Sequence, residues 1–283
     1  MRSISRLKKT ALMGGSLCAL LAAASAAYAQ VSSINSAIIV PRVFNDIPGA
    51  TGTYINGYPG SITLGESGVS KASGYADRDV WYFSNTGGAS AYTFQDGQYF
   101  DMSFGVTLSG GTPSYDLEAG ILFSNPTGTF GGDCQSLVTN GGVVVQFGGP
   151  SYYPFSPAAG GYPGAGATVP NYTLGQTYTL GLDYVVDPGT GNPAFEYSVN
   201  GLFAASSPGD PYFDLGGPLD TGVGSNSLGG YLQIQNDPNN PNQAGQAVFS
   251  NITITAVPEP ASLSLLAIGS VGLFVRRRAK SSV

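Results

Sequence analysis

The stretch Tyr178–Gly201, which reads YTLGLDYVVDPGTGNPAFEYSVNG, gives the strongest local indication of structure in this chain. Apolar and aromatic residues alternate with other residues over Tyr178–Val186 and again over Phe195–Val199. A period of two is typical of β-strands that bury one face. The segment DPGTGN between the two runs, Asp187–Asn192, is rich in residues that favour turns. The stretch therefore predicts a β-hairpin.

The same alternation recurs along much of the chain, and its most regular example is Tyr115–Phe123. There, five apolar residues share a face that we expect to be buried, while Asp116 and Glu118 point the other way. Short runs of this kind predict one all-β domain over residues 30–256, a β-sandwich of jelly-roll type. Its least regular part is a loop rich in glycine, proline and tyrosine, Gly148–Asn171. The expected strands are Val80–Ser84, Ala91–Phe94, Tyr99–Ser109, Tyr115–Phe123, Val143–Phe147, Tyr178–Val186, Phe195–Val199, Tyr231–Gln235 and Ala247–Thr255.

The order of these runs resembles the concanavalin-A-like lectin and glucanase jelly roll. The segments that carry the resemblance are QYFDMSFGVTLS, DLEAGILFSN, GQTYTLGLDYVVD, FEYSVNG and the closing GGYLQIQN and AVFSNITI. Together they span most of residues 75–256. The resemblance implies that the last strand, Ala247–Thr255, returns beside the first strand and so takes a central position in a sheet.

The N-terminal residues 1–29 have the layout of a secretory signal peptide. A basic segment at residues 2–9 precedes the apolar stretch Ala11–Ala24. Ala27 and Ala29 then form an A-x-A cleavage site around Tyr28. We expect export of the chain and cleavage after Ala29, with a membrane-spanning helix as the alternative.

The C-terminal residues 257–283 consist of a Pro-Glu-Pro triplet, an uncharged run and a basic cluster. At about 1.5 Å per residue, the uncharged run reaches roughly 22 Å, which is shorter than the ~30 Å hydrocarbon core of a membrane. The segment resembles the PEP-CTERM sorting signal, which implies a transient membrane helix, cleavage near the triplet by an exosortase-type enzyme, and delivery to the cell surface or its exopolysaccharide. A permanent C-terminal anchor is the alternative. The residues that carry the resemblance are Pro258, Glu259, Pro260, Arg276, Arg277 and Arg278.

The charge of the segment between these two signals limits its partners. Residues 30–257 hold three basic residues, Arg42, Lys71 and Arg78, against sixteen acidic ones, which gives a net charge of −13. Such a surface cannot neutralise phosphates, so we exclude nucleic acid as a partner. Anionic glycan is also disfavoured unless a divalent cation bridges the charges.

Several forms of catalysis are excluded by composition. The chain has no histidine, which removes Ser-His-Asp and Cys-His mechanisms and the usual zinc sites. Cys134 is the one cysteine outside the signal peptide, and we expect it in a loop. Asp116 and Glu118 lie two residues apart, roughly 7 Å on one strand face, where they are either a glycosidase-type carboxyl pair or two solvated carboxylates. The glucanases that the chain resembles usually carry two glutamates flanking an aspartate on one strand, and the first of these glutamates is missing here. We therefore expect no catalytic residues and no enzyme, with a glycan hydrolase or lyase using this pair as the alternative.

No cofactor is indicated, although two oxygen-rich segments are candidates for Ca²⁺. These are Asp77-Arg78-Asp79 and the stretch NDPNNPN, Asn236–Asn242. Neither matches the EF-hand loop, and Asx residues beside proline also form turns without a metal.

Aromatic residues supply the remaining prediction. Tyr152, Tyr153 and Phe155 lie among glycines and prolines and are candidate glycan contacts, because exposed aromatic rings stack on sugars. Trp81 alternates with Tyr82, and we expect it in the core. The sequence therefore predicts an exported surface or exopolysaccharide-matrix protein with a lectin-like, non-catalytic domain that binds neutral glycan. A structural coat protein without a ligand is the other possibility.

Overall fold

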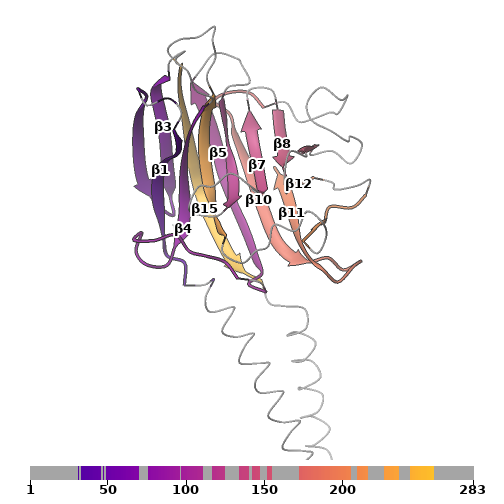
Figure 1. The fold of residues 1–283 in the computed structure, drawn as a ribbon. Helices are drawn as coiled ribbons and strands as arrows, with labels where there is room; N and C mark the ends of the chain where they lie inside the picture. The colour runs from indigo at the N-terminus through magenta and orange to yellow at the C-terminus, as the bar shows by residue number, and fades with distance from the viewer. Residues whose placement is uncertain are drawn as a thin grey trace, which may run out of the picture.

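The computed structural model describes residues 31–257 except residues 32, 46, 48, 70–75, 96, 111–116, 125–133, 140–141, 147–151, 155–171, 205–208, 216–225 and 236–242. The predicted signal peptide and the segment 258–283 lie outside these residues. Two antiparallel β-sheets pack face to face (Figure 1). Across the described ranges, no helix has the length and apolar character needed to cross a membrane. The prediction of an all-β sandwich of jelly-roll type is confirmed.

Sheet A carries most of the side chains of the candidate functional site. All of its neighbouring strands are antiparallel. In spatial order, the strands are β1 (Ser36–Asn45), β4 (Ala76–Ser84), β14 (Ser227–Gln235), β6 (Leu117–Ser124), β7 (Cys134–Thr139), β8 (Gly142–Gln146) and β9 (Tyr152–Pro154).

Sheet B is also antiparallel, and the last strand of the fold lies inside it. This strand, β15, pairs with β5 on one side and β3 on the other. The central position implied by the resemblance is confirmed, although the neighbours are the third and fifth strands rather than the first. In spatial order, the strands are β12 (Leu202–Phe203), β11 (Pro193–Val199), β10 (Thr177–Val186), β5 (Phe100–Gly110), β15 (Gln243–Ala256), β3 (Ser61–Val69) and β2 (Thr51–Gly57), with β13 (Phe213–Asp214) on β11.

The predicted hairpin is present as β10 and β11. Val186 pairs with Pro193, and the Asp187 N–H donates to the Asn192 carbonyl at 2.8 Å. The Asp187 carboxylate accepts hydrogen bonds from the Gly189 N–H and the Thr190 hydroxyl, which lower its pKa. Local turn chemistry therefore fixes the register of this hairpin.

The core between the sheets is aromatic, and Trp81 lies in it fully buried, as predicted. Its ring centroid is 5.3 Å from that of Phe83 and 5.7 Å from that of Phe249, both edge-on. A Cβ atom on Gly230 would lie 2.5 Å from Trp81 Nε1 and 2.8 Å from the Phe249 ring. Glycine is therefore required in the middle of β14, because the indole occupies the space of a side chain.

Some predicted boundaries were wrong. Strand β14 begins at Ser227, four residues before the predicted start. The predicted strand Ala91–Phe94 contributes only an isolated bridge, between Thr93 and Ser227. Cys134 begins β7 rather than lying in a loop. The prediction also missed β1, β2, β3, β7 and the short strands β9, β12 and β13.

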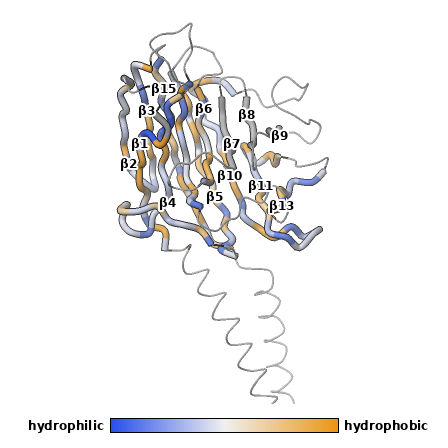
Figure 2. Tube along the Cα trace, in the orientation of Figure 1, coloured by the Kyte–Doolittle hydropathy of each residue, from blue (hydrophilic) through white to orange (hydrophobic). Residues whose placement is uncertain are grey.

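The second face of sheet A is also buried, which the sequence did not indicate. All residues of β4 are buried, and a separate apolar cluster of Val80, Tyr82, Leu122 and Tyr231 lies on the side away from the main core. Figure 2 shows hydrophobic positions spread along the strands of both sheets. A strand with two buried faces is typical of a central strand covered on both sides.

Candidate functional site

The face of sheet A that carries the second apolar cluster also holds a row of polar groups. Arg78 on β4, Gln233 on β14 and Glu118 on β6 are direct neighbours in the register of three adjacent strands. Tyr231 lies two residues before Gln233 on β14, so it projects from the same face. We refer to Arg78, Gln233, Glu118 and Tyr231 as the polar row.

Contacts within the polar row are close. The Arg78 Nε–H donates to Gln233 Oε1 at 2.8 Å, and the Arg78 guanidinium carbon lies 4.9 Å from the centre of the Tyr231 ring. Arg78 is 4% exposed and Gln233 3% exposed, whereas Glu118 is only partly buried. A guanidinium kept this far from water is costly unless neighbouring groups compensate it. The row is therefore a specific polar arrangement within a largely buried apolar face.

Glu118 is the titratable acid of the row. Burial raises the pKa of Glu118, while the Arg78 charge and a hydrogen bond from Tyr231 lower it, and burial has the larger effect. A carboxyl group with a raised pKa retains its proton to higher pH and can act as a general acid. Asp116, its predicted partner, lies outside the described residues. Glu118 itself is partly buried, whereas the sequence analysis favoured a solvated carboxylate.

The candidate glycan contacts belong to the same sheet. Tyr152 and Tyr153 form part of the edge strand β9 rather than an irregular loop, while Phe155 lies outside the described residues. Position 152 is in register with Leu122 of the second apolar cluster through Gln135 and Gln146. Position 153 belongs to the opposite alternation of the sheet. Position 152 thus shares its face with the polar row.

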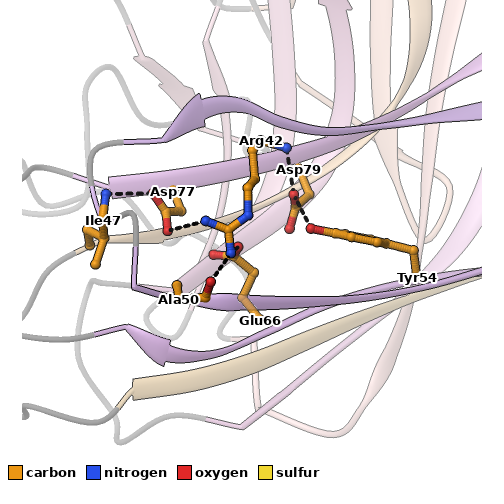
Figure 3. Close-up of polar contacts among 7 residues, drawn as sticks. All are labelled: Arg42, Ile47, Ala50, Tyr54, Glu66, Asp77 and Asp79. Carbon is orange, nitrogen blue, oxygen red and sulfur yellow. Dashed lines mark hydrogen bonds and ion pairs between the residues drawn. The ribbon is translucent and has the colours of Figure 1, made fainter.

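The predicted calcium segment Asp77-Arg78-Asp79 is part of a strand, not a turn. Alternation along β4 sends Arg78 to the polar row and both aspartates to the opposite face. There they join Arg42, Glu66 and Tyr54 in an inter-sheet cluster (Figure 3). The prediction of a turn was wrong because it rested on the acidic composition of the segment. The period of two that identifies DVWYF as a strand already includes these residues.

The inter-sheet cluster is organised around Arg42. Its guanidinium lies 3.2 Å from Glu66 Oε1 and 3.8 Å from Asp77 Oδ2 and also donates to the Ala50 carbonyl. Its backbone N–H donates to Asp79 Oδ1 at 2.8 Å, and the Tyr54 hydroxyl donates to the same oxygen at 2.9 Å. These contacts link β1 and β4 of sheet A to β2 and β3 of sheet B.

Three carboxyl groups share one guanidinium in this cluster, so their charges are not balanced. Burial, then the charges of Asp79 and Asp77, raise the pKa of Glu66 from 4.5 to about 8, against the opposing effect of Arg42. Burial also raises the pKa of Asp79. Glu66 therefore holds a proton at neutral pH. Among the described residues, no group of three Asp, Glu, Cys or His side chains is arranged to hold a metal ion, and Asn236–Asn242 lies outside them.

A third acidic group lies on the face of sheet B that points away from the core. Asp101, Asp183 and Glu196 are neighbours across β5, β10 and β11. Burial, followed by the charges of Asp101 and Glu196, raises the pKa of Asp183 from 3.8 to about 7. The sequence analysis did not identify this row, because only the strand register brings the three residues together.

The sequence analysis also missed Gln233, Tyr231, Arg42 and Glu66. The sequence does carry a signal for two arginines, Arg42 and Arg78. Arg42 and Arg78 are the described cations of a strongly acidic body, and a lone cation in such a body indicates a site of charge compensation. No comparable signal marks Gln233 or Tyr231, which are ordinary strand residues in the sequence.

The C-terminal segment is matched by a known motif. Residues 256–278 match the PEP-CTERM protein-sorting motif, as the sequence predicted. The motif indicates export and sorting to the cell envelope or surface. The match covers the tail and not the β-sandwich. A comparison with curated proteins found no significant match.

The β-sandwich is similar to solved jelly-roll structures at low sequence identity. An alginate lyase from Corynebacterium sp. is 11% identical, with a TM-score of 0.46 over 78% of this chain and 94% of that chain. Alginate lyase A1-II′, of polysaccharide lyase family 7, is 12% identical, with a TM-score of 0.42 over 72% and 82%. The carbohydrate-recognition domain of Emp47p is 13% identical, with a TM-score of 0.38 over 75% and 94%.

These structures correct one prediction. Two of the three are enzymes, so the expectation that a body of this type is not an enzyme does not stand. The expectation rested on the missing histidine and on an incomplete carboxylate motif. Those absences exclude particular mechanisms only, and the polar row still provides a carboxyl group, a phenol and a guanidinium in contact.

Proposed function

We propose that this is an exported protein of the cell surface or exopolysaccharide matrix that binds neutral glycan on the polar-row face of sheet A. The observation that carries the proposal is the polar row itself. It combines hydrogen-bonding groups with an aromatic ring on a largely buried apolar face, and Glu118 is its partly exposed member. Glycan sites generally combine such polar groups with apolar and aromatic surface.

The length of the face suits an extended saccharide. Between β4 and β9 lie β14, β6, β7 and β8, so at about 4.8 Å per strand Arg78, at one end of the row, lies roughly 24 Å from β9 across the sheet, and Glu118 on β6 lies roughly 14 Å from it. Glu118, the partly exposed member of the row, is where we place the first contact with sugar. Tyr152 is the proposed stacking residue at the far end, with Phe155 beside it in sequence.

The net charge supports a neutral ligand. A body with a charge of −13 repels uronate-rich polymers, and this repulsion weakens only with salt or a bridging cation such as Ca²⁺. Neutral glucan or mannan carries no such penalty. We therefore expect neutral glycan to bind with little dependence on salt, and uronate polymers to require Ca²⁺.

Cleavage of the bound polysaccharide is a second candidate function, favoured by Glu118. Its raised pKa and its hydrogen bond to Tyr231 suit proton donation to a glycosidic oxygen. Glu118→Gln would remove that proton with little change in shape. Release of oligosaccharide by the wild type but not by this variant would establish catalysis.

The binding proposal is tested by titrating the purified protein with glucan, mannan and alginate, with and without Ca²⁺. Tyr152→Ala should weaken neutral-glycan binding about tenfold, which corresponds to the ~1.4 kcal/mol of one lost stacking contact. Tyr153→Ala is the matched control, since it removes the same side chain from the opposite alternation of β9. Equal effects of the two substitutions, or no binding by the wild type, would refute the proposed site.

We further propose the processing of both ends. The signal peptide is removed after Ala29, and an exosortase-type enzyme recognises Pro258–Pro260 and the cluster Arg276–Arg278 and cleaves near the triplet. The match of residues 256–278 to the sorting motif supports the C-terminal step. The intact mass of the mature protein should correspond to residues 30 to about 258. A mass that still includes the arginine cluster would favour a permanent membrane anchor.

A further inference from the structure

The edges of the two sheets differ in how they are protected from pairing with other chains. Among the described strands, sheet A ends in β1 and β9 and sheet B ends in β12 and β2. Strand β1 contains Pro41 and a register shift between Val40 and Phe44, while β9 has three residues and β12 only two. Proline, bulges and short length are the devices by which proteins prevent edge-to-edge pairing.

Strand β2 has none of these devices. It runs for seven residues, Thr51–Gly57, in continuous register with β3 and without a bulge. Its sequence, TGTYING, contains no proline and no charged residue. Ile55 on this strand is 59% exposed. It lies on the face opposite Tyr54, whose hydroxyl donates to Asp79. A regular, uncharged edge with an exposed branched apolar residue is suited to accept another strand.

Side-chain hydrogen bonds also hold strand β2 in place. The Asn56 side-chain amide donates to the Ala37 carbonyl of β1 at 2.8 Å, and the Tyr54 hydroxyl is held in the inter-sheet cluster. These contacts attach β2 to sheet A as well as to β3. Little conformational entropy would be lost when such an edge pairs, because the strand is already ordered.

The absence of charge along this edge suits a second copy of this acidic chain as the occupant. Two bodies of charge −13 repel wherever acidic residues meet, so self-association requires an uncharged surface. The residues of β3 that point outward beside Ile55 are also uncharged: Ser61, Thr63, Gly65 and Ser67. An antiparallel contact of β2 with itself about Tyr54 places Thr53 opposite the partner copy's residue 55, and this contact closes with twofold symmetry.

We propose that two copies pair through β2, antiparallel, so that their B sheets form one continuous sheet. The backbone hydrogen bonds of the edge supply the contact, and Ile55 packs beside Thr53 of the other copy. Because the repulsion between the acidic bodies is screened by salt, the dimer should become tighter as ionic strength rises. Each dimer would present two polar-row faces, although the pairing itself does not depend on what those faces bind.

The test is sedimentation velocity of the purified protein from 1 to 100 μM, at low and at 0.5 M NaCl. We expect a concentration-dependent dimer that is favoured by salt. Ile55→Lys should weaken dimerisation at least tenfold. Thr63→Lys is the matched control, because it adds the same charge directly across from Ile55 on β3, one strand from the edge, and it should retain the dimer.

Circular dichroism and the melting temperature of both variants establish that each is folded. A wild type that stays monomeric at 100 μM in both salts would overturn the proposal. So would an equal effect of the two lysine substitutions, since this would place the contact elsewhere on the sheet face or ascribe it to total charge.

Discussion

Replacing Glu66 by glutamine should change how the stability of this protein depends on pH. The Glu66 side chain is 1% exposed, and its pKa is raised from 4.5 to about 8 by burial and by the neighbouring aspartates. The folded protein therefore binds this proton more tightly than the unfolded chain does. The stabilising contribution is complete below pH 4.5, decreases as pH rises, and is lost above about pH 8.

The magnitude follows from the two pKa values. One pH unit corresponds to about 1.4 kcal/mol, so a pKa change from 4.5 to about 8 accounts for at most about 5 kcal/mol. Glutamine has the shape of a protonated glutamate but cannot ionise. We therefore expect the variant to match the wild type near pH 5 and to exceed it by a few kcal/mol at pH 8.

Urea unfolding at pH 5, 6, 7 and 8 measures the effect, with fluorescence of the single tryptophan, Trp81, as the probe. Other carboxyl groups titrate in the same range, so the informative quantity is the difference between variant and wild type. Glu196→Gln, on the outer face of sheet B, is the control and should give a smaller difference because that residue is less enclosed. A constant difference across all four pH values would refute the assignment of a proton to Glu66.

Two further predictions concern stability. Asp183→Asn should be more stable than the wild type by a larger margin at pH 8 than at pH 5, because burial and two neighbouring carboxylates raise the Asp183 pKa to about 7. Urea unfolding of both proteins at both pH values checks this. A stability difference between variant and wild type that is the same at pH 5 and pH 8 would contradict it. Gly230→Ala should lower the free energy of unfolding by about 1–3 kcal/mol, because the added methyl group is forced against Trp81. Gly65→Ala is the control and should cost far less, because its added carbon lies 3.6 Å or more from its neighbours. Equal losses of stability in thermal unfolding would contradict this difference in packing.

Much of the fold was predictable because its signals are local. The alternation in Tyr178–Val199 and the turn residues between its two runs lie within one hairpin, and the structure keeps both. The same holds for Leu117–Ser124, where the apolar positions face the core as expected. A period of two also identified Trp81 as a core residue.

The remaining strands escaped prediction because distant contacts determine them. Strand β2 reads TGTYING, and its polar composition is tolerated only because it is an edge. The pair Gly229-Gly230 is typical of a turn, but in β14 these glycines accommodate the backbone and ring of Trp81, about 150 residues away. Steric demands of this kind leave no local pattern in the sequence.

The polar row was predictable only in part. Glu118 was singled out from its strand, but its partners Arg78 and Gln233 lie on strands that are adjacent only in space. The sequence analysis gave Arg42 and Arg78 no role of their own, because acidic residues dominate the composition. Each of them compensates buried carboxyl groups, one in the row and one between the sheets.

The position of β15 has a mechanical consequence for a protein sorted through its C-terminus. The strand ends at Ala256, and the Val257 N–H still donates to the Tyr99 carbonyl at 3.0 Å, so the sorting motif follows the folded body directly. Tension applied through that segment enters a strand with ladders on both sides, β3 and β5. Because the hydrogen bonds run across the strand, a pull along it loads many of them in shear at once, rather than opening them one after another as at an edge. Drag on the body is thus borne by the middle of sheet B.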